Sequence, residues 1–298
     1  MSPSAGAAIH IRNHELRYAV AGRDGGGVRL GRHEFEERPG RSLLADDDAG
    51  LVQEVSDVLR ADWGQALPDH GHVVVHPPEV YSFFVPLPVN ASAQQRRQHV
   101  LQQAALVTGT DAAADHHVVS ASVRPAPDQK GRSYEWEHIL VLPSGAYERV
   151  QSKLGSLVRN EWSWTVSTEA VARVPVTAAE GTTGVSLLIG TYETHTEFSL
   201  VRGGTWQHGW YTEAAGVPGN VVYFLRTFLN QQAVLPADLA AVRQYGEAPS
   251  PALRQALQED LGHDVSPLDP AAEREVEGAD LEAAFAPCLG AVLVEGAA

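Results

Sequence analysis

The chain has 298 residues, 44% of them hydrophobic, which is enough to bury the core of one large domain or two medium ones. Its 22 basic and 37 acidic residues give a formal net charge of −15, which disfavours binding to a nucleic-acid backbone or to anionic lipid. The single cysteine, Cys288, excludes an internal disulfide and a cysteine metal site. We therefore expect a protein of the reducing cytoplasm.

The N-terminal third alternates strand and turn signals. Residues 7–11, 16–22 and 28–36 alternate apolar and polar side chains, and Asp24-Gly25 is a typical hairpin turn between the second and third of them. This pattern predicts a three-stranded meander. No apolar run approaches the roughly 20 residues that span a bilayer, and residues 1–15 lack the pattern of a signal peptide.

The middle of the chain mixes helix and strand signals. Ser92 with Gln95 forms a capping box that predicts the start of a helix ending near Gly109. The prolines of residues 79–89 exclude a helix there. The remaining predicted elements are a helix within 45–64, strands at 72–78, 116–125 and 135–143, and a helix over 144–158.

The second half repeats the element order of the first. After the loop 177–184, three strand segments at 185–190, 196–204 and 205–213 are followed by an amphipathic helix. The apolar face of that helix consists of Val221, Leu225, Phe228 and Leu229. The repeat lies in the order of the elements, because sequence identity between the halves is slight.

A meander followed by a helix and a strand, used twice, resembles the actin-like ATPase superfamily. The chain is most similar to the branch that contains the pilus assembly protein PilM, the cell-division protein FtsA and the cytoplasmic domain of the secretion protein GspL. The segments that carry the resemblance are 73–105, 138–157, 161–174, 186–204, 242–270 and 285–294. In this family 161–174 is a helix that leads back to the main body, and 285–294 resembles the closing helix.

The resemblance implies an α/β fold of two ribonuclease-H-like halves. The expected boundaries are 1–175 for the first half, with an inserted subdomain at about 77–155, and 176–298 for the second half. Nucleotide binds between the halves in this family, where an aspartate in each of two hairpins orders the metal and water around the phosphates.

The expected phosphate hairpins have lost these aspartates. In the first hairpin His10 stands where the family has the aspartate, Arg12 stands where the family has a glycine, and Asn13 follows. Leu188 stands at the aspartate position of the second hairpin, although Gly190 and Thr194 are retained, and Tyr245-Gly246 replaces the paired glycines of the adenosine region. A leucine cannot hold magnesium, and a side chain at the glycine position obstructs the approach of backbone N–H groups to a phosphate. We expect no catalytic residues and no cofactor, with ATP and magnesium binding left open.

Histidines near acidic residues suggest a metal site at two places, residues 69–76 and 111–117. His70 and His72 share one side of an extended segment, and histidine with carboxylate suits zinc. Neither place offers a third convergent ligand in its own sequence. We therefore predict solvent-exposed loop histidines and no metal site.

The aromatic residues have two possible roles, core packing or contact with a partner. The pairs Trp162 with Trp164 and Trp206 with Trp210 are either core residues or an exposed patch for a peptide. A proline-stiffened extended segment carries further candidates for partner contact, which could instead fill the joint of the inserted subdomain. These candidates are Tyr81, Phe83, Phe84 and Leu87.

The lost aspartates and the resemblance together favour a non-catalytic scaffold of a type IV pilus or type II secretion system. Such a scaffold would be cytoplasmic and would bind a short cytoplasmic segment of an inner-membrane protein, without inserting into the membrane itself. Two alternatives stay open. One is a divergent sugar or acetate kinase with a relocated catalytic carboxylate, and the other is a degenerate paralogue that assembles with an active homologue.

Overall fold

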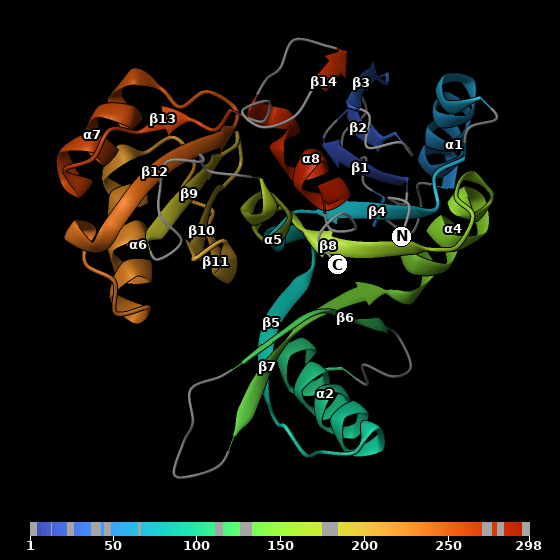
Figure 1. Ribbon diagram of the computed structural model, residues 1–298, viewed down its shortest axis with the longest axis horizontal. Coiled ribbons are helices and arrows are strands. Elements are labelled where there is room, and N and C mark those ends of the chain that lie inside the picture. The colour runs from blue at the N-terminus through green and yellow to red at the C-terminus, as the bar shows by residue number, and fades with distance from the viewer. Residues whose placement is uncertain are drawn as a thin grey trace.

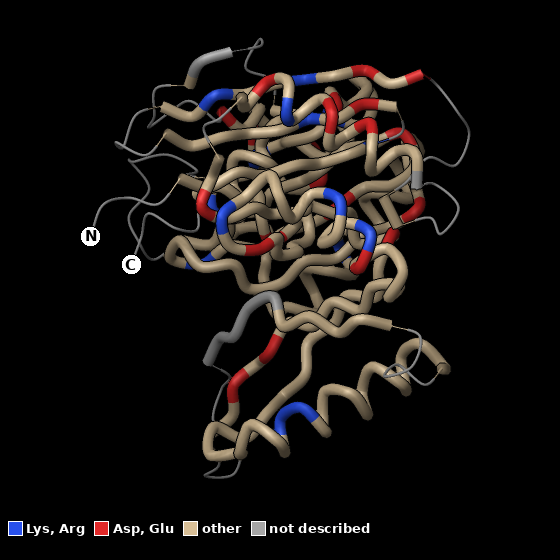
Figure 2. Tube along the Cα trace, turned by 90° about the vertical axis from the view of Figure 1, so that its right-hand side faces the viewer, with Lys and Arg blue, Asp and Glu red and all other residues tan. Residues whose placement is uncertain are grey.

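A computed structural model gives the fold, which consists of two similar sheets and a smaller third one (Figure 1). Among the helices that it describes, none is both long and apolar enough to cross a membrane. Acidic and basic residues are scattered over the described chain without forming a basic face (Figure 2). The described residues are 5–12, 14–22, 27–36, 43–44, 49–64, 67–110, 116–125, 133–174, 184–269, 276–278 and 283–293.

The first sheet contains the predicted meander. In the described chain its strand order is β14-β3-β2-β1-β4-β8, in which β1, β2 and β3 are antiparallel and β4 runs parallel to β1. The turn between β2 and β3, predicted at Asp24-Gly25, lies outside the described residues. The bounds are β1 Gly6–Arg12, β2 Glu15–Ala21, β3 Val28–Glu34, β4 His70–Val75, β8 Trp162–Val166 and β14 Val276–Gly278.

The two faces of the first sheet are covered by different helices. Ile9 and Val73 belong to the core that contains α1 (Ala49–Trp63) and α4 (Ser144–Leu154). Ala8 and Val74 pack instead against α8 (Ala286–Val292) on the opposite face. Because side chains alternate along a strand, the even-numbered residues of β1 and β4 face α8 and the second half.

The second sheet repeats the first. Its order is β11-β10-β9-β12-β13, so an antiparallel meander is again followed by two parallel strands, as in β3-β2-β1-β4-β8. This matching order confirms the predicted duplicated α/β fold. The bounds are β9 Val185–Thr191, β10 Thr196–Arg202, β11 Thr205–Thr212, α6 Pro218–Gln231, β12 Leu239–Gly246, α7 Pro251–Leu261 and β13 Ser266–Pro267.

The third sheet forms the inserted subdomain, which extends below the two larger sheets in Figure 1. Its strands β5 (Tyr81–Pro88), β7 (Tyr134–Pro143) and β6 (His116–Pro125) are antiparallel in that order, and α2 (Ala93–Thr108) covers them. The prolines of β5 are tolerated because β5 is an edge strand. Ser92 caps α2 as predicted, and Gly109 ends it with a left-handed φ of 69°.

Residues 161–174 correct one expectation. The resemblance predicted a helix, but the chain forms the strand β8 followed by the one-turn helix α5 (Ser167–Ala170). Trp162 and Trp164 are both buried, at 2% and 3% exposure, and they alternate with a less buried serine as a strand requires. The period of two therefore outweighs the family pattern.

The end of the described chain returns to the first sheet. Strand β14 pairs with β3, and α8 packs on β1, β2 and β4 between the two halves (Figure 1). Helix α8 approaches α5 closely, because a Cβ at Gly290 would lie only 1.9 Å from the carbonyl oxygen of Ala170. A division of the sequence at residue 175 thus leaves two late segments on the first sheet. Short 3-10 helices occur at Pro77–Glu79, Gly155–Leu157, Val171–Arg173, Pro236–Asp238 and Ala283–Phe285.

Candidate functional site

The two expected phosphate hairpins face each other across the gap between the sheets. Arg12, at the end of β1, places its guanidinium carbon 4.4 Å from the ring centre of Tyr192 in the β9–β10 turn. The same guanidinium forms an ion pair with Glu247, just after β12. Arg12 therefore links the first hairpin to the second hairpin and to the expected adenosine region. Asn13 lies outside the described residues.

A buried carboxylate lies behind this contact. Glu197 of β10 is completely buried and accepts hydrogen bonds on both oxygens. The Ser167 hydroxyl donates to both oxygens, at 2.7 and 2.8 Å, and the Tyr245 hydroxyl donates to Oε2 at 2.6 Å. His76 Nδ1 and His195 Nε2 lie 2.6 and 3.1 Å from Oε1. We call His10, His76, Ser167, His195, Glu197 and Tyr245 the central cluster.

Strand alternation explains why this cluster forms. His10 lies two residues after Ala8 and His76 two residues after Val74, so both histidines extend the face that points toward the second half. Their Nε2 atoms lie 2.8 Å apart. Glu197 in turn alternates with Phe198, which packs into the core of the second half beside α6. Each half therefore turns polar residues of its strands toward the other half.

The electrostatics of the cluster favour an ionised Glu197. Burial by itself would raise the pKa of Glu197, but the charge of His76 and the hydrogen bonds of His195 and His76 outweigh it and lower the pKa well below its ordinary value. Burial, together with the charges of His76 and Arg17, lowers the pKa of His10. Burial and the nearby Glu197 charge raise the pKa of Tyr245. His10 and Tyr245 are therefore neutral, and Tyr245 is fixed as a donor.

The structure explains the departures in the second hairpin. Leu188 is fully buried and belongs to the apolar core that continues into the first half. The retained Gly190 lies against the Tyr245 ring, where a Cβ would come within 2.5 Å of that ring. Gly246 has a φ of 76°, and a Cβ there would meet the Thr191 carbonyl oxygen at 2.7 Å. The two glycines therefore make room for close packing within the protein itself.

Thr194, the other retained residue, is exposed. Its hydroxyl oxygen lies 3.0 Å from His195 Nδ1. It thus orients a histidine of the central cluster. Ser167 donates to Glu197 itself and not to a histidine, so the arrangement differs from a nucleophile activated by a base. The cluster is a network of hydrogen bonds around one buried carboxylate, in which His10 Nδ1 has no partner among the described residues.

Comparison with known proteins gives a match at the level of the fold. No family model matches the chain, and no curated protein matches its sequence. A solved structure titled the PilM-PilN type IV pilus biogenesis complex aligns with a TM-score of 0.70 at 15% identity, over 97% of this chain and 97% of that chain. A Bacteroides thetaiotaomicron protein described as having an actin-like ATPase fold and unknown function aligns with a TM-score of 0.54 at 10% identity, over 91% and 93% of the two chains.

The chain has the actin-like ATPase fold. In this fold the central cluster lies between the two halves. His10, expected in the first hairpin, belongs to this cluster, whereas Leu188 lies in the apolar core that also contains Tyr245. Sequence reasoning missed Glu197, His195 and Ser167. One signal was available, because His195 and Glu197 are two residues apart and therefore share one side of an extended segment.

A second buried pair attaches the inserted subdomain of this actin-like fold to its body. The Nδ1 atom of His138, in β7, lies 2.9 Å from Glu169 Oε2. Its Nε2 atom lies 2.8 Å from the Ser82 hydroxyl oxygen. Arg173 donates to the other oxygen of Glu169 at 2.6 Å. We call Ser82, His138, Glu169 and Arg173 the junction cluster.

The junction cluster borders a hollow of about 200 Å³ between the inserted subdomain and the second half. Of the predicted partner residues, Tyr81 and Phe84 line this junction hollow. Tyr81 is 46% exposed, whereas Leu87 is fully buried in the subdomain core and does not reach the surface. Phe83 packs at the edge of that core. Phe84 also packs 5.3 Å from Trp206, centre to centre, so it contributes to the joint as well.

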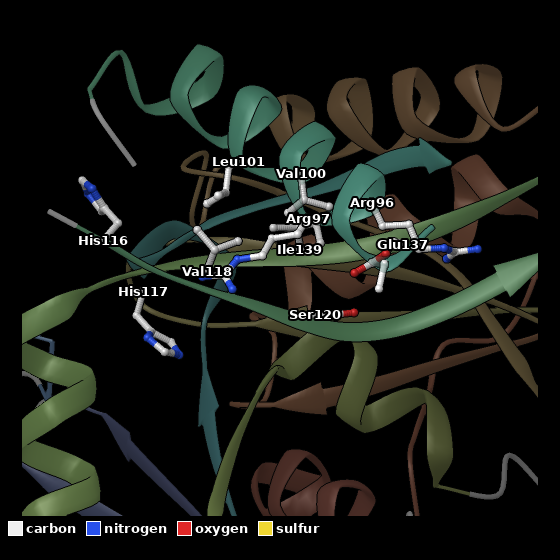
Figure 3. Close-up of a pocket in the computed structure, with 11 residues that line it drawn as sticks. Arg96, Arg97, Val100, Leu101, His116, His117, Val118, Ser120, Glu137 and Ile139 are labelled. Carbon is white, nitrogen blue, oxygen red and sulfur yellow. The ribbon is translucent and has the colours of Figure 1, made fainter. Parts of the chain in front are cut away.

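A larger groove of about 510 Å³ lies within the inserted subdomain (Figure 3). Helix α2 contributes Arg97 and Leu101 to one wall, and β6 and β7 contribute Val118 and Ile139 to the other. The ring of His117 turns away from this groove and stacks on Tyr147 at 3.4 Å between centres. The groove is therefore apolar at its base, with charged residues at its rim.

The other histidine candidates do not converge. His70 lies 3.0 Å from the Asn160 amide nitrogen, and His72 lies 2.6 Å from the Ser163 hydroxyl. Burial lowers the pKa of His72 to about 4. Asp111 and Asp115 lie outside the described residues. Only His76 of the first predicted group meets further potential ligands in the described chain, and these come from the second half.

Proposed function

We propose that the protein is a non-catalytic scaffold of a cell-envelope machine, of the type IV pilus or type II secretion class. In this proposal it stays in the cytoplasm and binds a cytoplasmic segment of an inner-membrane partner. The observation that carries the proposal is the central cluster, a buried network of protein side chains that joins the two halves. The fold similarity to the PilM-PilN complex over 97% of both chains supports the choice of machine.

Nucleotide chemistry requires a site that compensates the charge of the phosphates. Phosphoryl transfer depends on positioned metal and donors that compensate phosphate charge. Here a nucleotide would have to separate Arg12 from Tyr192 and displace the partners of Glu197, which is completely buried. Leaving a buried charge without its partners costs about 3–5 kcal/mol. The architecture of the fold is thus retained while its ancestral ligand is disfavoured.

The junction hollow is our proposed contact site for the partner. Two apolar side chains at its rim, Tyr81 and Val107, are 46% and 45% exposed. Trp206 and Trp210 line it from the second half. A volume of about 200 Å³ holds one or two anchoring side chains, so a short peptide segment with an apolar anchor fits this site.

The test uses the full chain as bait on detergent-solubilised membranes of the source organism. We expect it to capture an inner-membrane protein of a pilus or secretion system, and a synthetic peptide of the cytoplasmic tail of that protein should bind in fluorescence anisotropy. Capture of no such protein would contradict the proposal.

Two neighbouring residues of α2 provide matched variants for this peptide assay. Val107→Asp places a charge in the junction hollow and should weaken binding at least tenfold, a change of about 1.4 kcal/mol or more. Leu106→Asp, at a residue that is 76% exposed and does not line the hollow, should change binding less than twofold. Equal effects of the two variants would place the peptide elsewhere, with the α2 groove as the next region to mutate.

A divergent kinase is the second candidate, and one observation favours it. Glu197 provides a carboxylate between the two hairpins, although both loop aspartates are missing. A kinase would consume ATP with magnesium and a sugar or small acid as acceptor, and Glu197→Gln would abolish this activity. The scaffold proposal predicts no turnover above the buffer rate with any acceptor.

A further inference from the structure

We propose that His76, His195 and Glu197 form a binding site for a divalent transition-metal ion of the zinc class. These three residues are buried, and their nearest ligand atoms all lie within 4.8 Å of one another. Two of the ligands come from the β9–β10 hairpin and one from the end of β4. A metal at this position would therefore connect the two halves of the fold.

The geometry is close to that of a tetrahedral site. Zinc binds histidine nitrogen and carboxylate oxygen at about 2.0–2.2 Å, which places neighbouring ligand atoms roughly 3.3–3.5 Å apart. In the structure Glu197 Oε1 lies 2.6 Å from His76 Nδ1 and 3.1 Å from His195 Nε2. Shifts of less than about 1 Å in these two separations bring them to the spacing of a metal-bound set.

A second layer of contacts already orients the three ligands. Each histidine uses its second ring nitrogen in a further contact. His10 Nε2 lies 2.8 Å from His76 Nε2, and the Thr194 hydroxyl lies 3.0 Å from His195 Nδ1. Tyr245 donates to Glu197 Oε2 and Ser167 to both oxygens, while Oε1 also faces the two histidines. Metal-binding histidines in proteins characteristically use their second nitrogen in such a contact, which fixes the tautomer and the ring orientation.

The surroundings favour a cation. Glu197 is a completely buried carboxylate, and a carboxylate removed from water is stabilised by positive charge close to its oxygens. The hydroxyl of Tyr192 is buried and has no hydrogen-bond partner in the described chain, and its ring lies 4.4 Å from that of His76. A metal with a bound water would supply both the charge and a polar partner within this enclosed space.

The donor set selects the class of metal. Imidazole nitrogen suits zinc, copper, nickel and iron, whereas magnesium prefers oxygen ligands in an octahedral arrangement. Two histidines and one glutamate leave a fourth tetrahedral position open. The site therefore differs from the magnesium-nucleotide site of active relatives, although it lies in the same part of the fold.

Direct metal binding tests this inference on the full chain without an affinity tag. After equilibration with zinc and removal of free metal, elemental analysis should find one equivalent per chain. Cobalt(II) should give the visible absorption bands of a tetrahedral site, and magnesium should not compete with it. A wild-type chain that binds neither zinc nor cobalt(II) at micromolar concentrations would overturn the proposal.

Variants localise the metal. His195→Gln should lose the cobalt spectrum, while two controls, His72→Gln and the surface variant His117→Gln, should keep it, because neither residue contacts the three ligands. Ser167→Ala removes only an outer contact and should weaken metal binding about 10- to 100-fold. Should His195→Gln fail to fold, the wild-type stoichiometry together with the Ser167→Ala affinity decides the question. Unchanged binding by a folded His195→Gln variant, or an unchanged affinity of Ser167→Ala, would overturn the assignment.

Discussion

The central cluster and the junction cluster use the same chemistry in different surroundings. Each contains a buried glutamate beside a histidine Nδ1, at 2.6 Å for Glu197 with His76 and 2.9 Å for Glu169 with His138. In the central cluster every partner of the carboxylate is buried. In the junction cluster Glu169 also pairs with Arg173, whose side chain is 27% exposed, beside an open hollow.

This difference separates two roles of a buried carboxylate. Glu197 is completely buried and contacts His76 of the first half and Tyr245 of the second, so it links the two halves. Glu169 instead fixes the inserted subdomain at one edge, while the adjacent surface stays accessible. The following predictions test whether the centre is more tightly coupled to stability than the junction.

The largest expected effect comes from Glu197→Ala. This variant removes one partner of a fully buried network and should lower the free energy of unfolding by about 3–5 kcal/mol. Urea denaturation followed by circular dichroism measures the change. The matched control is Glu193→Ala in the turn that precedes β10, which is exposed and should stay within about 0.5 kcal/mol of wild type. Similar losses in the two variants would contradict the proposed role of the centre.

His138→Ala should have a smaller effect. Glu169 keeps its contact with Arg173 in this variant, so we expect a loss of about 1–3 kcal/mol. Limited proteolysis should show earlier cleavage within the inserted subdomain than in wild type. A loss as large as that of Glu197→Ala would show that the two clusters contribute equally to stability.

Gly190→Ala tests whether the retained glycine serves the protein's own packing. A methyl group there meets the fully buried Tyr245 ring at 2.5 Å, so the variant should lose about 1–3 kcal/mol. Gly219→Ala is the control, because no atom lies within 4 Å of a Cβ in α6 at that position. It should be neutral or stabilising by up to about 1 kcal/mol. A neutral Gly190→Ala variant would contradict the packing explanation.

The pH dependence should be the mildest effect. Burial lowers the pKa of His72 to about 4, below the value near 6.5 of an unfolded histidine. The unfolded chain therefore binds more protons between these values, and stability falls as the pH drops from 6.5 towards 4. His72 should account for a loss of at most about 2 kcal/mol between pH 7 and pH 5.

The variant His72→Gln should flatten this dependence, while His10, whose pKa is also lowered, preserves part of it. Glu197 acts at lower pH, because its pKa is depressed and its stabilisation is lost only as the pH falls below about 4. Urea denaturation at several pH values measures the loss of stability in both pH ranges. A dependence in His72→Gln as steep as in wild type would exclude His72 as a contributor.

The sequence predicted the strands and helices of this protein better than its central cluster. Strand alternation and the capping box of Ser92 gave the meanders and α2 almost residue by residue. The family resemblance implied aspartates at the positions of His10 and Leu188, and their absence is seen directly in the sequence. These features depend on residues that are close in the sequence.

The partners of Glu197 could not be predicted in the same way. His76 and Ser167 lie 121 and 30 residues from Glu197 in the sequence, and they meet it only after the two halves pack together. The helix expected at 161–174 is a different case, because it followed the family resemblance although the alternation of Trp162 and Trp164 favours a strand. Contacts between halves depend on tertiary packing that a single sequence does not reveal.

The central claim is that protein side chains occupy the position of the nucleotide. Isothermal titration of the purified wild-type chain with magnesium-ATP, paired with a thermal unfolding scan, tests it most directly. The account predicts no binding heat and no change in melting temperature at millimolar ATP. A saturable, magnesium-dependent binding curve would contradict it, with a stabilisation near 2.7 kcal/mol expected at about 100 times the dissociation constant.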